Sequence, residues 1–501
     1  MNKPYNSPIP IILLLFFSCN IADIKLEQQQ GEWAIPLIQG EIKVADLINQ
    51  ATTNATLQVL PDGLLNLRYT GDVLQKTKKD IFTPIPGGIP IPMLDTVNLV
   101  TLPVVNNVII KKAILANGNY FIQFTHNRAE PVQLKMWVPE MKLNNQIIRL
   151  NINIPYNGNV PVSGISDKFP FDDIVMIPVD NKIGLHYQAM NANNEIFKMS
   201  SIFFLYDQID FKYIEGFIGQ NVYDLQKDSI DIDLYDSFVQ GSIYIDDPKV
   251  TVTVNSSFGF PTKALVNQFD LQSRDGSLIT FKSKILDEGM YFDYPKLAEA
   301  GQTKSTTFVF TKTNSNISEV FNTQAKRVIY DIDALSNPLL KPDSTTFILE
   351  NSKFTINLTV DLPLKGNVSQ YPASRIFETD ASSLNDLAEG ALLIESTNGI
   401  ALSANAQLYL YNANNQLIDS VFTTPQPLFK SALTDAQGYS IQPVTNMLTI
   451  PIAANKISHW SQTRKIKVSA VFNTPAGKTI IQITNKDVLK LRIGFVGKLK
   501  L

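Results

Sequence analysis

The chain has 501 residues and a mass of 55.9 kDa, which is too long for one compact core and predicts several modules. Its formal charge is −3 and its isoelectric point about 5.8, so the basic footprint of a nucleic-acid-binding protein is excluded. The 28 Phe and 17 Tyr residues can bury a core, which argues against disorder.

The first twenty residues contain the parts of an export signal in their usual order. Lys3 supplies a positive charge, and Ile9–Phe17 form an apolar run that is too short to span a bilayer. A serine and then Cys19, the only cysteine of the chain, follow directly. This arrangement resembles a bacterial lipoprotein processing site, although Phe16 and Phe17 stand where that family usually has Leu and a small residue.

The resemblance implies a lipid anchor at Cys19. In that family the signal, here residues 1–18, is removed, a diacylglycerol is joined to the cysteine sulfur, and the amine is acylated. Each buried CH₂ contributes about 0.8 kcal/mol, so several acyl chains would hold the protein on a membrane without a transmembrane helix. Residues 19–30 would then be a polar tether, and we expect an outer-membrane location, on the cell surface or the periplasmic face. The alternative is a plain secretory signal, with Cys19 lost or incidental.

Strict alternation of apolar and polar residues, the pattern of strands with one buried face, dominates the rest of the chain. It is clearest at Ile148–Ile154, Val250–Val254 and Ile356–Leu362, and each run ends at a turn. The three runs start roughly a hundred residues apart, about the length of one immunoglobulin-like sandwich. The spacing predicts a strand that recurs once in each module.

Turn residues between shorter alternating runs predict hairpins. These are expected between Leu57–Val59 and Leu65–Tyr69, between Leu402–Tyr411 and Leu417–Phe422, and between Ile466–Phe472 and Ile480–Ile483. Leu489–Phe495 is expected to be a closing strand.

Helical patterns are few and short. They cover Lys43–Gln50, a segment from Asn316 to Ala325 that starts with a capping-box-like pair of Asn316 and Glu319, and Ser382–Glu389. The prolines of Thr83–Pro92 remove backbone donors, so this segment is expected to be extended, as a linker or an edge loop.

These patterns predict an all-β protein of tandem antiparallel β-sandwich modules with a few short helices. The sandwiches would be immunoglobulin-like or similar to late-embryogenesis-abundant type-2 domains. After the signal (1–18) and the tether (19–30), we expect an N-terminal β-rich region at 31–115 with a proline-rich segment at 83–92, then modules at 116–205, 206–334 and 335–501.

Several segments also resemble uncharacterised outer-membrane and surface lipoproteins of Bacteroidota type. They are Glu32–Leu37, Ile42–Leu47, Asp62–Leu65, Phe211–Gly219, Ile245–Lys249, Asn255–Pro261, Asp361–Gly366 and Asp419–Phe422. The likeness covers most of the chain after the signal, but its motifs are turn and core signatures. Because that family has no established activity, the resemblance implies a fold and a cellular location, but no catalytic activity.

The histidines and acidic residues form no catalytic or metal motif. His126, His186 and His459 lie far apart, without the spacing of metal ligands. Acidic residues cluster at 228–236 and at Asp246–Asp247. In the first cluster aspartates alternate with apolar residues, which favours the wet face of a strand over a calcium loop. We therefore expect no catalytic residue, no metal and no cofactor.

The tryptophans are candidates for sugar contacts, since glycan sites often use exposed aromatic rings. Trp33, Trp137 and Trp460 are the only tryptophans, and their neighbours favour core packing over exposure.

One sequence pattern points to a modification. Asp followed by Ser or Thr and then by an aliphatic residue or Thr resembles the O-glycosylation site of exported Bacteroidota-type proteins. It occurs four times, which makes Thr96, Ser229, Ser344 and Ser420 the candidate glycosylation sites.

The expected function is a non-enzymatic binding or scaffolding role at the cell envelope. The partners would be the membrane, through the lipid on Cys19, and an envelope protein or a glycan. A first alternative is a lipid- or glycan-binding protein with an apolar cavity in one module, lined by Phe211–Gly219 and the helix at Ile317–Ala325. A second alternative is a hydrolase with a site between modules, but the sequence contains no nucleophile, metal or phosphate motif that supports it.

Overall fold

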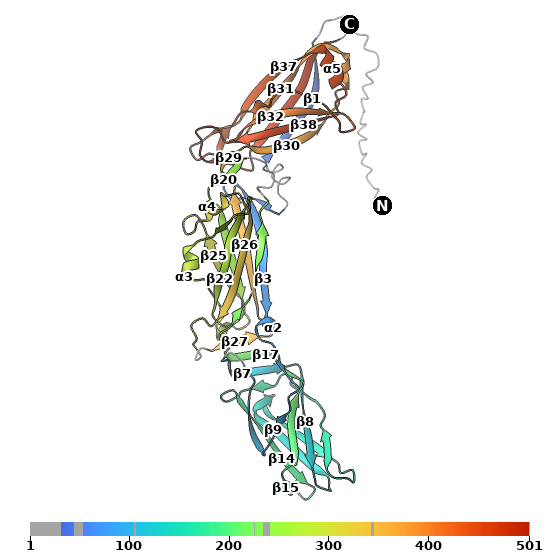
Figure 1. The fold of residues 1–501 in the computed structure, drawn as a ribbon, viewed down its shortest axis with the longest axis vertical. Coiled ribbons are helices and arrows are strands. Elements are labelled where there is room, and N and C mark those ends of the chain that lie inside the picture. The colour runs from blue at the N-terminus through green and yellow to red at the C-terminus, as the bar shows by residue number, and fades with distance from the viewer. Residues whose placement is uncertain are drawn as a thin grey trace, which may run out of the picture.

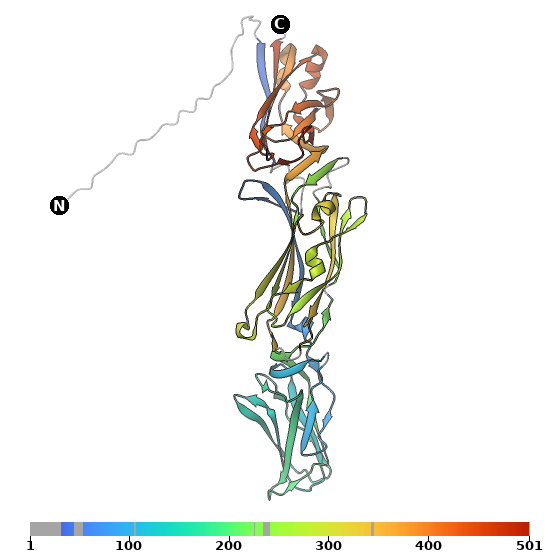
Figure 2. The same ribbon diagram turned by 90° about the vertical axis from the view of Figure 1, so that its left-hand side faces the viewer.

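The computed structural model describes residues 32–44, 54–104, 107–224, 226–233, 241–341 and 345–499. They form three β-sandwich bodies arranged end to end in an elongated molecule (Figure 1, Figure 2). All strand pairs named below are antiparallel, and the helices are short, so the predicted all-β sandwich class is confirmed. We call the parts the upper body, the middle body and the distal body, in the order from top to bottom of Figure 1.

The upper body consists of residues 32–44 and 371–499. One sheet, in the order β1-β40-β31-β37, contains β1 (Glu32–Lys43), β40 (Val488–Leu499), β31 (Leu387–Asn398) and β37 (Val444–Ile452). The other, β30-β38-β32-β33 with β34 beside β32, contains β30 (Tyr371–Glu378), β38 (Lys465–Asn473), β32 (Ser403–Tyr411), β33 (Leu417–Ser420) and β34 (Gln426–Phe429). Alternation along β40 buries Leu491, Ile493 and Phe495 between the sheets. The smaller elements are η2 (Ser382–Asp386), the pair β35 (Leu433–Thr434) and β36 (Ser440–Gln442), and α5 (Ala454–Trp460).

The middle body consists of residues 56–77, 222–336 and 353–363. One sheet, β2-β3-β28-β21-β25, contains β2 (Thr56–Val59), β3 (Leu65–Thr77), β28 (Lys353–Pro363), β21 (Lys249–Ser256) and β25 (Lys304–Phe310). The other contains β18 (Val222–Tyr223), β19 (Asp228–Asp231), β26 (Ala325–Ser336), β22 (Thr262–Ser273), β23 (Leu278–Thr280) and β24 (Tyr291–Phe292). The short helices are α3 (Lys284–Glu288), η1 (Leu297–Glu299) and α4 (Ile317–Phe321).

The distal body is the continuous segment 85–217. Its larger sheet contains β4 (Ile85–Pro86), β6 (Val97–Thr101), β7 (Ile109–Ala116), β9 (Val132–Leu143), β10 (Gln146–Ile154), β13 (Val175–Met176), β14 (Lys182–Asn191), β15 (Ile196–Phe197) and β17 (Gln208–Phe217), and β27 (Thr346–Leu349) joins it at β17. The smaller sheet contains β5 (Ile91–Pro92), β8 (Asn119–His126), β11 (Val162–Ile165), β12 (Phe169–Pro170) and β16 (Ser201–Tyr206). Phe171, Phe211 and Leu134 are fully buried in its core.

Short elements connect the bodies. A three-stranded sheet of β20 (Ser242–Ile245), β29 (Lys365–Ser369) and β39 (Ile481–Gln482) lies between the upper and middle bodies. Helix α2 (Lys78–Ile81) and β27 lie between the middle and distal bodies (Figure 1).

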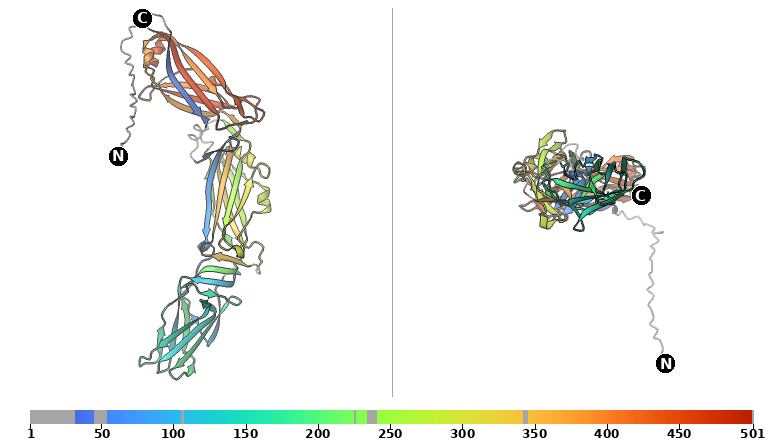
Figure 3. Two further views of the ribbon diagram at one scale, coloured as in Figure 1. Left: turned by 180° about the vertical axis from the view of Figure 1, so that it is seen from behind. Right: turned by 90° about the horizontal axis from the view of Figure 1, so that it is seen from below.

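The three bodies are nested along the chain. The distal body is inserted into the middle body, and the middle body is inserted into the upper body, where β1 pairs with the last strand, β40, from Glu32↔Lys498 to Lys43↔Val488. From behind, β1 is visible inside the upper body, beside strands from the other end of the sequence (Figure 3). The expected module boundaries at 115, 205 and 334 each fall inside a strand, in β7, β16 and β26, because local alternation does not reveal which strands pair.

The expectation of one recurring strand in each module was wrong. The runs at 250–254 and 356–362 form β21 and β28, which are neighbours in one sheet, with Val252 opposite Leu358. They are therefore two strands of the middle body, and only the first run, in β10, belongs to another body.

The other local predictions have mixed outcomes. The hairpins β2–β3 and β32–β33 are confirmed, whereas β39 pairs with β29 and not with β38. Thr83–Pro92 forms the extended edge strands β4 and β5. Of the helices, α4 is confirmed over a shorter range, Ser382–Glu389 is a 3-10 turn that runs into β31, and Lys43–Gln50 lies outside the described residues beyond position 44.

Candidate functional site

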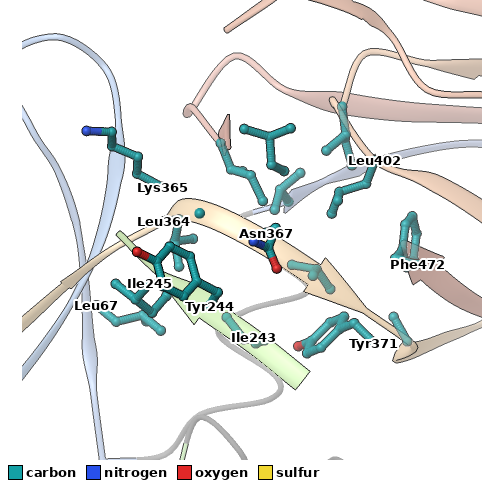
Figure 4. A pocket seen from close by; sticks show the side chains of 17 residues that line it. Leu67, Ile243, Tyr244, Ile245, Leu364, Lys365, Asn367, Tyr371, Leu402 and Phe472 are labelled. Carbon is teal, nitrogen blue, oxygen red and sulfur yellow. The ribbon is translucent and has the colours of Figure 1, made fainter. Parts of the chain in front are cut away.

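An apolar cleft lies where the upper body meets the middle body (Figure 4). Leu67 and Ile243 line it from the side of the middle body, and Tyr371, Leu402 and Phe472 line it from the upper body. Its volume of about 90 Å³ is below the roughly 150 Å³ of an engineered cavity that binds benzene. An acyl chain is much larger than this space, so the cleft does not suit a lipid.

Charged residues join strand β29 to the middle body beside the cleft. Lys365, whose ammonium points away from the cleft in Figure 4, lies 2.9 Å from the carboxylate of Asp246 and also pairs with Asp247. Lys312 contacts the same two carboxylates, at 3.3 Å from Asp246. We call these four residues the junction quartet. Burial alone would raise the pKa of Asp247, but hydrogen bonds from Lys312 and Lys365 outweigh it and lower the pKa.

Four aspartates of the acidic clusters are paired within the protein. Asp246 and Asp247 belong to the junction quartet, and Asp231 on β19 pairs with Arg327 on β26. Asp233 accepts hydrogen bonds from the backbone N–H of Asn54 and the hydroxyl of Tyr69. Carboxylates engaged in this way are less suited to act as calcium ligands.

A second charged contact lies at the junction between the middle and distal bodies. The ammonium of Lys78, at the start of α2, lies 2.5 Å from the carboxylate of Asp210 on β17 and donates to the carbonyl of Phe211 at 2.8 Å. Both side chains are at least nine-tenths buried. Burial alone would raise the pKa of Asp210, but the bonds from Lys78 and from the Phe211 N–H outweigh it and lower the pKa.

The three histidines lie in separate places. His126 is buried in the distal body, where its Nδ1 accepts the N–H of Arg128 and its Nε2 has no hydrogen-bond partner. Burial lowers the pKa of His126. The Nε2 of His459, on α5, lies 3.2 Å from the carbonyl of Ile418. Within the part of the chain that the structure describes, no three His, Cys, Asp or Glu side chains are grouped as metal ligands.

An aromatic row that the sequence did not reveal crosses the outer face of the distal body. Val97, His186, Trp137 and Arg149 are direct partners on the adjacent strands β6, β14, β9 and β10. Trp137 stacks on His186 at 5.4 Å, and the Arg149 guanidinium lies 5.7 Å from its ring. Core packing was the wrong expectation for Trp137, since alternation directs its side chain outward.

The other two tryptophans have different outcomes. Trp460 is 2% exposed, as expected, and donates its ring N–H to Asp419. The side chain of Trp33 lies outside the described part of the structure.

Three of the four candidate glycosylation sites are described. Thr96 and Ser229 are half-buried, and Ser420, also half-buried, lies at the end of β33. In all three the carboxylate of the preceding aspartate accepts the backbone N–H of the Ser or Thr, at 2.7 to 2.8 Å. Asp210 makes the same bond to Phe211, so the bond is not specific to the motif. Ser344 lies outside the described residues.

Cys19, the expected lipid-attachment site, also lies outside the described residues, which begin at Glu32. Among the described residues, no helix is both long and apolar enough to cross a membrane.

The segments proposed to line an apolar cavity belong to packed cores. Phe211 and Phe217 on β17 are 1% exposed, and Ile317 and Phe321 on α4 are 0% exposed. Neither segment contributes to the cleft at the upper junction.

Comparisons with known proteins give no assignment. No protein-family model matches the chain, and no curated protein matches it. Among solved structures, a protein of Parabacteroides distasonis proposed to be secreted is similar over 93% of this chain and 99% of its own, with 8% identity and a TM-score of 0.29. The infectious bursal disease virus Gx strain structure is similar over 91% and 85%, with 9% identity and a TM-score of 0.15. Such low TM-scores support no argument about function.

Proposed function

We propose that this protein is a lipid-anchored envelope protein whose rod presents the distal body for binding, without catalysis. The observation that carries the proposal is the nesting of the three bodies. It places β1 and β40 side by side in the upper body and leaves the distal body at the other end (Figure 1). A lipid on Cys19 would join the rod thirteen residues before Glu32, at the upper body.

The paired aspartates and the small cleft favour binding over the two alternatives. The junction quartet and the Lys78–Asp210 pair use their charged groups on each other, as structural contacts do. The outer face of the distal body, with its aromatic row, is instead built from side chains suited to contacts with a partner.

The test is the mass of the protein purified from its native host. We expect the mature chain to start at Cys19, to carry acyl groups there, and to enter the detergent phase in a phase separation. The Cys19→Ala variant should lose the acyl mass and stay in the aqueous phase. Acyl-free mature protein in the aqueous phase would refute the anchor.

The same spectra report the proposed O-glycosylation. Added sugar mass should map to peptides that contain Thr96, Ser229, Ser344 or Ser420, and a chain carrying only peptide and lipid mass would remove this part of the proposal.

A further inference from the structure

Strand β6 is an open edge of the distal body. Among the described residues it pairs only with β14, so its other side carries no strand. Val97 is 52% exposed and Leu99 is 73% exposed, and the neighbouring Leu94 is 80% exposed. An uncovered strand with apolar side chains is a template for pairing with another chain.

The hydrogen-bond pattern shows which backbone groups are available at this edge. Thr96 accepts the N–H of Tyr187, and Leu102 donates to the carbonyl of Asn181. In an antiparallel ladder hydrogen-bonded positions recur at every second residue, so positions 98 and 100 also bond toward β14. Val97, Leu99 and Thr101 therefore direct their N–H and C=O groups outward.

Most other long edges of the molecule carry features that discourage pairing. Proline or charged residues interrupt β1 at Pro36 and Glu41, and β30 at Pro372 and Arg375. Of the edge strands in the described part of the chain, β6 is the longest that contains neither a charged residue nor a proline.

We propose that β6 pairs antiparallel with β6 of a second copy of this chain, around a two-fold axis at Leu99. Leu99 then faces Leu99 of the other copy, and Val97 faces Thr101, each facing pair exchanging two N–H···O bonds. The register is self-complementary, because it places apolar and β-branched side chains opposite each other and brings no like charges together. A foreign peptide would find the same edge, but the match of the strand to itself favours a second copy.

The pairing fixes the direction of the two rods. Adjacent antiparallel strands in one sheet are related by an axis perpendicular to the sheet. Because β14, the partner of β6, runs along the distal body toward the tip at β15, the two rods point in opposite directions and overlap at their distal bodies (Figure 1). If the upper ends are lipid-anchored, which rests on the proposed function, the dimer joins copies on two facing surfaces and not neighbours on one surface.

Disulfide formation between single-cysteine variants tests the register. The protein is produced as a Cys19→Ser variant in a host without the glycosylation system, so neither lipid nor a glycan at Thr96 intervenes. Facing hydrogen-bonded residues have Cα atoms about 5.5 Å apart, within the range that a disulfide bridges. Under mild oxidation, the Leu99→Cys protein should form a covalent dimer alone. The Val97→Cys and Thr101→Cys proteins should form one only when mixed.

The control variant is Leu417→Cys, since Leu417 is 57% exposed but lies in the upper body, and it should form no covalent dimer. Sedimentation of the Leu99→Lys protein should show at least a tenfold weaker self-association than the parent, because two ammonium groups would face each other. Circular dichroism should show that all variants are folded, as Leu99 is largely exposed.

Two results would overturn the proposal. One is a Leu99→Cys protein that stays folded and monomeric under oxidation. The other is a Val97→Cys protein that cross-links to itself as readily as to the Thr101→Cys protein, which would indicate a different register. Because the protein in these experiments carries no lipid, their outcome is independent of the test of the anchor.

Discussion

Asp487 is a buried acid at the turn before β40, and its environment makes the upper body sensitive to pH. The side chain is 5% exposed and accepts the backbone N–H of Thr484 at 2.7 Å. Burial raises the pKa of Asp487 to about 6, although the bonds from Thr484 oppose the shift. An unfolded chain would ionise this group near its ordinary pKa of about 3.9.

The consequence is that Asp487 contributes more to the stability of the upper body on mild acidification. Between about pH 7 and pH 4 the folded state takes up a proton that the unfolded state does not, so the free energy of unfolding rises as the pH falls through 6. At pH 7.5 the folded protein holds a poorly solvated carboxylate. An Asp487→Asn substitution removes that charge and keeps an oxygen to accept from Thr484.

We therefore predict that Asp487→Asn stabilises the upper body by about 1 to 3 kcal/mol at pH 7.5 and by much less at pH 4.5. Denaturant unfolding at both pH values measures the difference. Asp386→Asn, at an exposed position of the same body, is the matched control and should change little. Equal stability of the Asp487→Asn protein and the parent at pH 7.5 would contradict the argument.

At the scale of single elements, the Lys78–Asp210 pair joins the start of α2 to β17 across the lower junction. Removing one partner of a buried pair leaves an uncompensated charge, which costs about 3 to 5 kcal/mol. The exposed pair of Lys212 and Asp173, which is also made from β17, provides a comparison at 2.7 Å. Exposed pairs contribute about 0 to 1 kcal/mol.

We predict that Lys78→Met lowers the free energy of unfolding by about 3 kcal/mol, whereas Lys212→Met lowers it by less than about 1 kcal/mol. The double variant Lys78→Met/Asp210→Asn should recover part of the loss, since no charge is then left unpaired. Denaturant titration of the four proteins measures these values. A similar loss of unfolding free energy in both single variants would mean that the buried Lys78–Asp210 pair contributes no more to stability than the exposed Lys212–Asp173 pair.

The contrast between confirmed and failed strand predictions has a physical origin. Alternation is a local property, so β10, β21 and β28 could be located from the sequence, as could the hairpin of β2 and β3, whose turn joins neighbouring segments. Pairing of distant strands depends on loop closure over hundreds of residues and on complementary faces, which no local pattern contains. The pairing of β1 with β40 and the nesting of the bodies were therefore not predictable.

The same reasoning applies to the candidate sites. The partners of Asp246 are Lys312 and Lys365, and those of Trp137 are His186 and Arg149, all distant in sequence. A signal for the aromatic row did exist, because Trp137 alternates with the apolar residues Met136 and Val138 of β9 and so had to face the other side of the sheet.

At the scale of the whole molecule, the nested chain gives each junction more than one covalent crossing. The chain crosses the upper junction twice, between β1 and β2 and between β28 and β30, and the small sheet of β20, β29 and β39 combines strands from both sides of it. Its apolar cleft is not completely filled, at about 90 Å³, so shape complementarity alone leaves this junction imperfectly packed. In the junction quartet, Asp246 and Asp247 of the middle body pair with Lys365 on strand β29 of this small sheet, so we expect these charges to restrain the sheet relative to the middle body.

We predict that Asp246→Asn/Asp247→Asn widens the distribution of angles at this junction without unfolding either body. Spin labels on cysteines that replace the exposed Leu417 in the upper body and Leu278 in the middle body, in a Cys19→Ser background, report the distance distribution by pulsed electron spin resonance. The distribution should broaden, because Lys312 and Lys365 lose their charged partners.

The matched control is Glu389→Gln, which removes an exposed ion pair with Lys498 inside the upper body and should leave the distribution unchanged. A distribution equally narrow in all three proteins would show that apolar contacts around Leu67 and Phe472 are sufficient to hold the angle. A broadened distribution would mean that the charges make the rod rigid. A rigid rod would, in turn, keep the distal body at a fixed distance from whatever surface holds the upper end.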